Sequence, residues 1–312
     1  MERFVTTPSG IRLWVETIGD PGAPPLLLIM GGMAQAIMWP EAFCRELADA
    51  GHLVVRYDHR DTGRSSTVDA ARHPYSLADL TDDAAEIIRQ VGGGPAHVVG
   101  QSVGGMVAQL LALDFAELVR SLVLVGTSSD SCSDLRRPPR GGLPGVADEM
   151  IAFARAVEQD PPGTPEAMFE AQLTSWRVLV GPHAPFDEDA WRDVLCRAQR
   201  RRQGPDTAGN HAGALDASPS RAHRLGRIAV PTLVVHGRRD PLFPVEHGRE
   251  LAREIPGARL AEIDGLGHVF PPQWMPVLRD LILGHTSPGS GAPPGSAPYR
   301  RAAAKVTMNG TC

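Results

Sequence analysis

Apolar and polar positions alternate along this chain in a way that predicts strands and helices taking turns. Short apolar runs predict strands at 2–6, 11–17, 25–30, 52–57, from 96 to the motif at 100, 118–126, 230–236 and 258–263. The run at 25–30 has no polar member, which is typical of a central strand covered on both faces. Amphipathic stretches predict helices at 39–50, 77–91, 246–254 and 274–285. Another helix is expected directly after the motif at 100–104, ending at about 114.

This alternation indicates an α/β fold, a mostly parallel eight-stranded sheet with helices on both faces. The first two strands are joined by Pro8-Ser9-Gly10, a turn-type cluster that predicts an opening hairpin. Between 128 and 227 the strand pattern stops, and helix-like patches separated by Pro and Gly pairs predict a helical cap. We therefore expect a core domain formed by 1–127 and 228–286, with the cap inserted between its halves.

Composition narrows the class of protein. The 312 residues carry a net charge of −5 with 42% hydrophobic positions, which gives no electrostatic reason to expect nucleic acid or an anionic membrane as partner. Cys44, Cys132, Cys196 and Cys312 lie far apart with no C-x-x-C pair, so we expect free thiols, no metal site and no cofactor. The start lacks a signal-peptide pattern and no apolar run is long enough for a bilayer, which predicts a cytoplasmic protein. The Ser/Gly/Pro/Ala-rich stretch 287–312 has no core pattern and is expected to be a disordered tail.

The central chemical motif is Gly100-Gln101-Ser102-Val103-Gly104, placed where a strand turns into a helix. The pattern G-x-S-x-G at such a turn is a nucleophile elbow, in which a sharp turn exposes the serine hydroxyl. The flanking glycines are expected to avoid a collision of side chains with that serine. Because glycine is frequent in this chain, the motif needs support from a base and an acid elsewhere.

Candidates for the acid and the base follow two late strands in the expected order. Asp240 follows the strand at 231–236, and His268 follows the strand at 258–263 in a glycine-rich loop. A serine hydroxyl is a weak nucleophile, so a histidine must take its proton and an acid must fix the tautomer of that histidine. The rival positions are, for the acid, Asp58, Asp61 and Asp264, and, for the base, His236 and His247.

An acyl-transfer reaction also needs N–H donors for the oxyanion of its tetrahedral intermediate. One donor is expected to be the N–H of Val103, directly after the nucleophile and at the positive end of a helix. The second should come from the loop after the strand at 25–30. We assign it to Gly32, with Met33 as the alternative.

Across about residues 1–286 the chain resembles the serine esterases of the α/β-hydrolase family, and among these the aclacinomycin methylesterases. The resemblance is carried by LLLIMGG at 26–32, RYDHRDTGRS at 56–65, AHVVG at 96–100 and RLAEI at 259–263. It implies an α/β-hydrolase fold, a triad of Ser102, Asp240 and His268, and the donors Gly32 and Val103. It also implies a methyl ester of a polycyclic aromatic polyketide as substrate, held under the cap. Met33 and Gln101 depart from the pattern of these relatives.

The remaining features have simpler interpretations. The charged loop 58–65 is expected to be structural, with Asp58 and Arg60 bonding backbone near the oxyanion loop. The run 197–202 is expected to be a solvated helix face. Met33 and Trp176 are predicted to contact an apolar small-molecule substrate. Fold and triad do not fix the scissile bond, so a C–C bond or lactone hydrolase and a non-catalytic small-molecule receptor stay as alternatives. The sequence does not indicate an oligomeric state.

Overall fold

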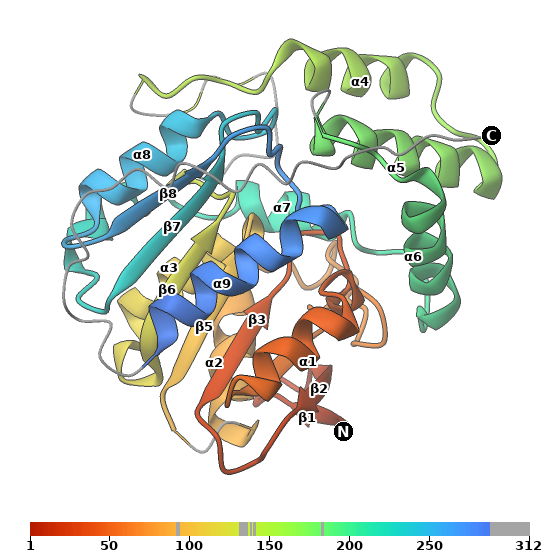
Figure 1. Cartoon of the computed structure of the whole chain (residues 1–312). Coiled ribbons are helices and arrows are strands. Elements are labelled where there is room, and N and C mark those ends of the chain that lie inside the picture. The colour runs from red at the N-terminus through yellow and green to blue at the C-terminus, as the bar shows by residue number, and fades with distance from the viewer. Residues whose placement is uncertain (92–93, 131–136, 138, 140–141, 182–183, 288–312) are drawn as a thin grey trace, which may run out of the picture.

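The computed structural model describes residues 1–91, 94–130, 137, 139, 142–181 and 184–287. Eight strands of this described chain form one sheet in the spatial order β1-β2-β4-β3-β5-β6-β7-β8 (Figure 1). The strands are β1 (Glu2–Thr6), β2 (Arg12–Ile18), β3 (Pro25–Ile29), β4 (Leu53–Tyr57), β5 (Ala96–Gln101), β6 (Val119–Val125), β7 (Thr232–Gly237) and β8 (Arg259–Ile263). Strand β2 runs antiparallel to both β1 and β4, and all other pairs are parallel. The predicted mostly parallel sheet and its opening hairpin are confirmed.

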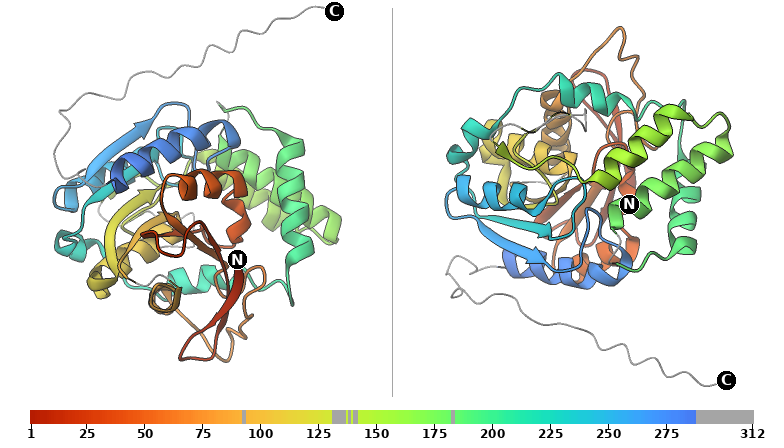
Figure 2. Two further views of the ribbon diagram at one scale, coloured as in Figure 1. Left: turned by 60° about the horizontal axis from the view of Figure 1, so that its bottom comes forward. Right: turned by 90° about the horizontal axis from the view of Figure 1, so that it is seen from above.

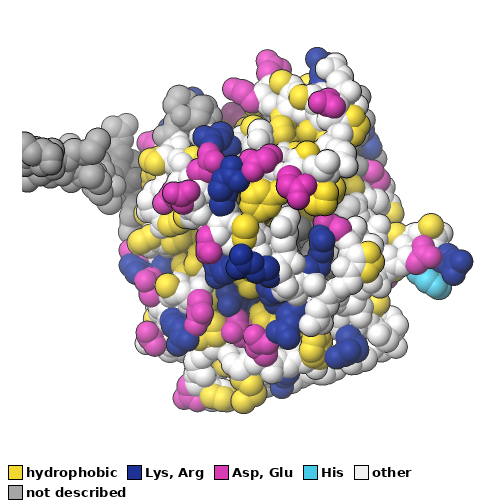
Figure 3. Space-filling model, turned by 90° about the vertical axis from the view of Figure 1, so that its right-hand side faces the viewer, with side chains coloured by type: hydrophobic (Ala, Val, Ile, Leu, Met, Phe, Trp, Pro, Cys, Tyr) yellow, Lys and Arg dark blue, Asp and Glu magenta, His cyan; other side chains and the backbone are white. Residues whose placement is uncertain are grey.

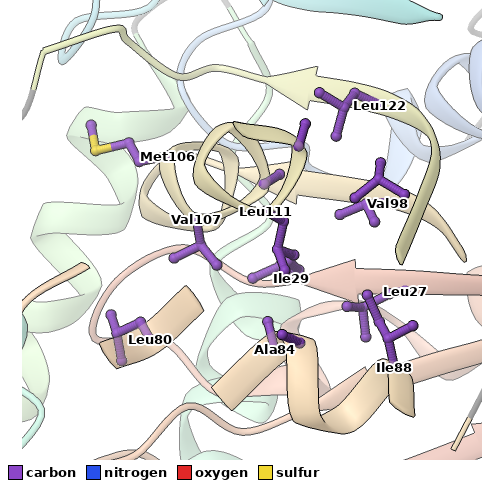
Figure 4. Close-up of a cluster of buried hydrophobic side chains, with 14 of the residues drawn as sticks. Leu27, Ile29, Leu80, Ala84, Ile88, Val98, Met106, Val107, Leu111 and Leu122 are labelled. Carbon is purple, nitrogen blue, oxygen red and sulfur yellow. The ribbon is translucent and has the colours of Figure 1, made fainter. Parts of the chain in front are cut away.

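Helices cover both faces of the sheet. Helices α1 (Glu41–Asp49) and α9 (Met275–Thr286) pack on one face. Helices α2 (Leu77–Val91), α3 (Val103–Asp114) and α8 (Val245–Glu254) pack on the other. Along β3, Leu27 and Ile29 join the α2 and α3 cluster drawn in Figure 4, whereas Leu26 and Leu28 face α1 and α9. This two-sided burial explains why the strand has no polar alternation.

The helix predicted at 39–50 begins at Glu41. Trp39 closes a short 3-10 turn, η1 (Ala36–Met38), and Pro40 has an extended backbone with ψ of 143°. Further 3-10 turns are η2 (Ala116–Leu118), η4 (Ala222–Arg227) and η5 (Pro272–Trp274). The ring of a proline keeps the residue before it out of the helical region, and Trp39 is accordingly extended with ψ of 106°, so the helix cannot begin at 39 and Pro40 becomes its N-cap.

The insertion between β6 and β7 contains helices and no strand among its described residues. The helices are α4 (Asp148–Gln159), α5 (Pro165–Val180), α6 (Glu188–Arg201) and α7 (Asn210–Asp216). Figures 1 and 2 show α4, α5 and α6 grouped on one side of the molecule. The helical character of this segment agrees with the predicted cap. Its boundaries at 128 and 227 stay predictions.

Two further expectations from the sequence bear on the described chain. Cys44 and Cys196 are free thiols, and the other two cysteines, Cys132 and Cys312, lie outside the described residues. The predicted tail at 287–312 also lies outside them, except for Ser287. A search of the described helices found none with the length and apolar character that a bilayer crossing requires.

Two histidines are buried in the core region as neutral side chains. His59 is fully buried and donates through Nε2 to the carbonyl oxygen of Met30 at 3.0 Å. His97 is 6% exposed and its Nδ1 lies 2.7 Å from the Ser121 hydroxyl. Burial is the main cause that lowers the pKa of His59 to about 3 and that of His97 to about 4. In the unfolded chain both groups return to an ordinary pKa near 6.5.

Acidification should therefore destabilise the fold through these histidines. As the pH falls below 6.5, His97 is protonated in the unfolded chain, whereas in the folded chain it stays neutral down to about pH 4. The free energy of unfolding therefore decreases as the pH falls through that window. We expect the stability advantage of the native protein over His97→Gln to shrink between pH 7.5 and pH 5, because the variant lacks this proton uptake. Urea denaturation of both proteins at several pH values measures it. A constant difference across the window would contradict the assignment of His97 as a buried neutral group.

Candidate active site

Ser102 sits at the sharp turn between β5 and α3. Its backbone has φ of 53° and ψ of −119°, one of the few positive φ angles at a non-glycine residue. The Ser102 N–H donates to the Val125 carbonyl at 3.0 Å, and the Thr127 hydroxyl donates to the Ser102 carbonyl at 2.7 Å. These bonds hold the residue in a conformation that costs about 1–3 kcal/mol in isolation.

The two flanking positions, 100 and 104, must be glycine because neighbouring backbone atoms lie too close to leave room for a Cβ. A Cβ at Gly100 would lie 2.3 Å from the carbonyl oxygen of Gly104, and one at Gly104 would lie 2.3 Å from the carbonyl oxygen of Ile29. The sequence predicted a collision with the serine itself. The structure corrects this, because the obstructing atoms belong to the backbone of α3 and β3. The glycines let the helix start against the strand before it.

Asp240 and His268 are brought together at the ends of β7 and β8. His268 Nδ1 lies 2.8 Å from Asp240 Oδ2, and both side chains are buried. The other oxygen, Asp240 Oδ1, accepts the N–H groups of Leu242 and Phe243, each at 2.8 Å. Burial alone would raise the pKa of Asp240, but the charge and hydrogen bond of His268 and smaller contributions together hold it below its ordinary value. An ionised carboxylate only accepts hydrogen bonds, so the proton is on Nδ1 and Nε2 is left as a base.

The loop that carries His268 is fixed by the insertion and by the elbow. The His268 N–H donates to the Leu179 carbonyl of α5 at 2.7 Å, and Gln101 Nε2 donates to the His268 carbonyl at 3.3 Å. A Cβ at Gly267 would lie 2.4 Å from the Val180 carbonyl oxygen, so only glycine permits this approach of loop and helix. Gln101, at the variable position of the elbow, thus links the serine turn to the histidine loop.

The rival acids and bases have other partners. Asp58 accepts the N–H of Ala36 at 2.9 Å, and Asp61 accepts the Tyr75 hydroxyl at 2.7 Å. The side chain of Asp264 is 88% exposed. His236 Nε2 bonds the Phe243 carbonyl at 2.7 Å, and His247 Nδ1 lies 2.8 Å from the Ser128 hydroxyl. His236 Nε2 also lies 3.5 Å from Asp240 Oδ2, but its close partner is the Phe243 carbonyl, whereas His268 bonds Asp240 at 2.8 Å and lines the cavity with Ser102.

The loop after β3 approaches the start of α3. A Cβ at Gly32 would lie 2.8 Å from Val103 Cγ2, so glycine allows this loop to lie against the first residue of the helix. The N–H of Met33 donates to His211 Nδ1 at 2.8 Å. Since the Met33 N–H is already bonded, Gly32 is the better placed of the two donors that the sequence left open.

A cavity of about 350 Å³ opens over these residues. Gly32, Ser102, Val103 and His268 lie in its wall. Both residues predicted to contact substrate line it: Met33, which is half exposed, and Trp176, which stacks on Trp191 with ring centroids 4.9 Å apart. Further apolar lining residues come from both core and insertion: Met106, Pro139, Val146, Met150, Leu179, Ala212, Leu215, Leu242, Phe243 and Val269. Ser128, Asp130, Arg137, His211 and His247 also line the cavity, so a mainly apolar wall is combined with a set of polar and charged groups, as in many ligand sites.

Two predictions about charged residues need correction. The guanidinium of Arg60 pairs with Asp83 at 2.7 Å, and it is the Arg60 backbone carbonyl that accepts from His211 of α7. Asp58 does bond backbone beside the oxyanion loop, as predicted. Arg201, the last residue of α6, points its side chain toward the core and bonds Asp58 at 2.6 Å and Gln35 at 2.8 Å. The expectation of a solvated run was wrong there, because a buried carboxylate 143 positions away offered a partner.

The rest of that run does lie on a solvated face. Arg197 pairs with Asp193, and Arg202 pairs with Asp206. Figure 3 shows basic and acidic side chains interspersed over the side of the molecule that carries α6. Short-range pairs of this kind contribute little energy and no anion site.

Comparisons with known proteins agree with this geometry. Residues 24–272 match the model of the family described as alpha/beta hydrolase fold. Rhodomycin D methylesterase DauP of Streptomyces sp. (strain C5) is 39% identical over 304 residues, covering 92% of this chain and 98% of the relative. Rhodomycin D methylesterase DnrP of Streptomyces peucetius is 38% identical with the same coverage.

Solved structures share the architecture. A hydrolase from Pseudomonas aeruginosa PA01 superposes with a TM-score of 0.69 at 27% identity, over 91% of this chain and 97% of that one. The esterase RhEst1 from Rhodococcus sp. ECU1013 has a TM-score of 0.73 at 21% identity, over 91% and 99%, which is a likeness of fold. The elbow, the strand-end acid and base, and these similarities lead to one assignment: the chain belongs to the α/β-hydrolase family.

Proposed function

We propose that this protein is a serine hydrolase that cleaves a carboxylic ester, a methyl ester of a bulky apolar or polyketide-type acid, through an acyl-enzyme. The observation that carries the proposal is the 2.8 Å bond between His268 and Asp240, with His268 and the elbow serine both in the wall of a large, mainly apolar cavity. The methylesterase relatives support the ester and its methyl group. The segment 128–227 would serve as the cap over the substrate.

The chemistry follows from the positions of the groups. His268 Nε2 takes the proton of Ser102 as its Oγ attacks the ester carbonyl carbon, and the carbonyl oxygen becomes an oxyanion. The N–H groups of Gly32 and Val103 stabilise that oxyanion, and the start of α3 adds its positive dipole. Collapse breaks the C–O bond, and His268 gives its proton to the departing alcohol. Water, activated by His268, then releases the acid and restores Ser102.

A second, smaller chamber suits a small alcohol group. It has a volume of about 20 Å³, and its wall contains Trp39, Trp191, Gln101, Trp176 and Val269. The last three also line the large cavity, so the two spaces adjoin at the residues next to Ser102 and His268. Since about 10–15 Å³ holds one water-sized group, this chamber fits a methyl group and little more. The leaving alcohol must lie beside His268, and the small chamber is lined by Val269, the next residue, so we assign the methyl group to this chamber.

Replacing the nucleophile tests the reaction class. Ser102→Ala should lower kcat/KM for a methyl or p-nitrophenyl ester by at least about 10³-fold, because no other group can form the acyl-enzyme. Ester turnover is the measurement, and an unchanged thermal unfolding midpoint is the control. Turnover within tenfold of the native rate would refute the mechanism.

Removing the charge of the acid tests the tautomer argument. Asp240→Asn should lower kcat by about 10⁴-fold, since an amide can donate to His268 Nδ1 and leave the proton on the wrong nitrogen. Steady-state kinetics measures this effect. A loss smaller than tenfold would show that another acid orients His268.

The small chamber predicts selectivity for the alcohol group. In a series of methyl, ethyl and butyl esters of one bulky aromatic acid, kcat/KM should fall at least about tenfold from methyl to butyl. Competition between the esters in one reaction gives the ratio directly. Equal rates would contradict the assignment of the chamber. Turnover of a lactone or a C–C substrate in preference to every ester would favour the alternative hydrolase.

A further inference from the structure

Two buried histidines from outside the proposed catalytic triad hold the loop that carries the proposed donor Gly32. His59 donates through Nε2 to the carbonyl of Met30 at 3.0 Å, at the start of the loop. His211 Nδ1 accepts the N–H of Met33 at 2.8 Å, at its end. The rings of the two histidines meet edge to face with centroids 5.6 Å apart. His211 is contributed by α7 of the insertion, 178 positions from Met33.

The partners of His211 determine its tautomer. Its Nε2 lies 2.9 Å from the backbone carbonyl of Arg60, and a carbonyl can only accept, so Nε2 carries the hydrogen. Nδ1 is then a bare acceptor, which is what the Met33 N–H requires. Both hydrogen-bonding positions of a neutral imidazole are thus filled by backbone groups of two different loops of the core.

We infer that His211 is a positioning residue for the oxyanion hole: its Nδ1 fixes the Gly32–Met33 peptide plane and thereby holds Gly32 against Val103. This inference rests on the proposed function and assigns a role in it to a cap residue. His211 contacts the donor loop and is not itself the base, the acid or the oxyanion donor.

The local backbone explains why such a bond is needed. Met33 has φ of 63°, a left-handed conformation that a residue with a side chain adopts only when its surroundings hold it there. A Cβ at Gly32 would lie 2.8 Å from Val103 Cγ2 and 3.7 Å from His211 Nδ1, so Gly32 lies between the two. Without the acceptor, the Gly32–Met33 peptide keeps only the long bond from the Ala34 N–H to the Gly31 carbonyl, 3.4 Å, across this turn, so the backbone of Gly32 is held less firmly.

The surroundings of His211 keep it neutral and in place. Burial lowers its pKa, and the charge of Arg60 adds to this, while Asp61 and the bond to the Arg60 carbonyl act in the opposite direction. His59 and Tyr75 face the ring edge-on. Arg60 itself is tied to Asp83 at 2.7 Å, so the carbonyl that orients His211 belongs to an anchored segment.

Helix α7 is attached to the core independently of His211. The Thr207 hydroxyl donates to Asp61 Oδ1 at 2.6 Å, and Asn210 Nδ2 donates to Asp61 Oδ2 at 3.2 Å and to the Val68 carbonyl at 3.0 Å. A substitution at His211 can therefore break the bond to Met33 while the helix stays seated. Thr207→Val removes one attachment, leaves those of Asn210, and provides a control for cap seating.

A matched pair of variants separates the two bonds of His211. In His211→Asn the amide oxygen lies where Nδ1 was and can still accept from Met33. In His211→Gln the amide nitrogen lies where Nε2 was, so it keeps the bond to Arg60 and loses that to Met33. We expect kcat for a methyl ester to fall about 10- to 100-fold in His211→Gln and less than threefold in His211→Asn and Thr207→Val. This loss is smaller than the 10²–10³-fold that follows removal of an oxyanion donor.

The split between kinetic constants distinguishes positioning from cavity shape. KM should change less than threefold in all three variants, because the oxyanion forms after the substrate has bound. Equal kcat losses in the Asn and Gln variants, or a rise in KM at unchanged kcat, would overturn the inference while ester turnover by the native protein upholds the proposed function. A native protein without ester turnover would overturn both.

Hydrogen exchange gives a readout that needs no substrate. The Met33 amide should exchange at least tenfold faster in His211→Gln than in the native protein and in His211→Asn, because its acceptor is missing only in the Gln variant. Mass spectrometry of peptides spanning 31–36 measures the rate. Equal protection of this amide in both variants would show that His211 does not hold the loop.

Discussion

The site depends on one constraint: the backbone must turn from β5 into α3 within a single residue. Ser102 meets it with a positive φ, and the helix then begins so close to the sheet that positions 100 and 104 have no room for a Cβ. The strain of about 1–3 kcal/mol is offset by the bonds from Thr127 and to Val125 and by burial of α3 on the central strands. This geometry places Ser102 and Val103, the first residue of the helix, side by side in the wall of the cavity.

The other parts of the site are built around that turn by segments far apart in sequence. The end of α5 accepts the N–H of His268, Arg201 of α6 bonds Asp58 and Gln35, and His211 of α7 holds Met33. The insertion therefore lines the cavity and also contributes hydrogen bonds to both loops that flank Ser102. If it is the substrate cap that we propose, one set of helices would serve both the choice of substrate and the geometry of the reaction.

Much of the fold and the placement of Ser102, Asp240 and His268 could be predicted from the sequence because their signals are local. A strand without polar alternation, a glycine two places from a serine, and an acid or base just after a strand are each visible within about ten residues. The contacts that Arg201, Arg60 and His211 make could not be predicted. Each depends on a partner more than 20 positions away, and an arginine run or a lone histidine has the same sequence whether it is solvated or buried.

The central claim is that Ser102 is an activated nucleophile, and covalent labelling tests it most directly. A fluorophosphonate probe reacts with a serine whose proton is taken by an adjacent base and whose oxyanion is stabilised. The account predicts one adduct per chain, mapped by mass spectrometry to the peptide that contains Ser102, and slower labelling when a methyl ester competes. Absence of an adduct, or an adduct on another residue, would contradict the account and favour a small-molecule receptor.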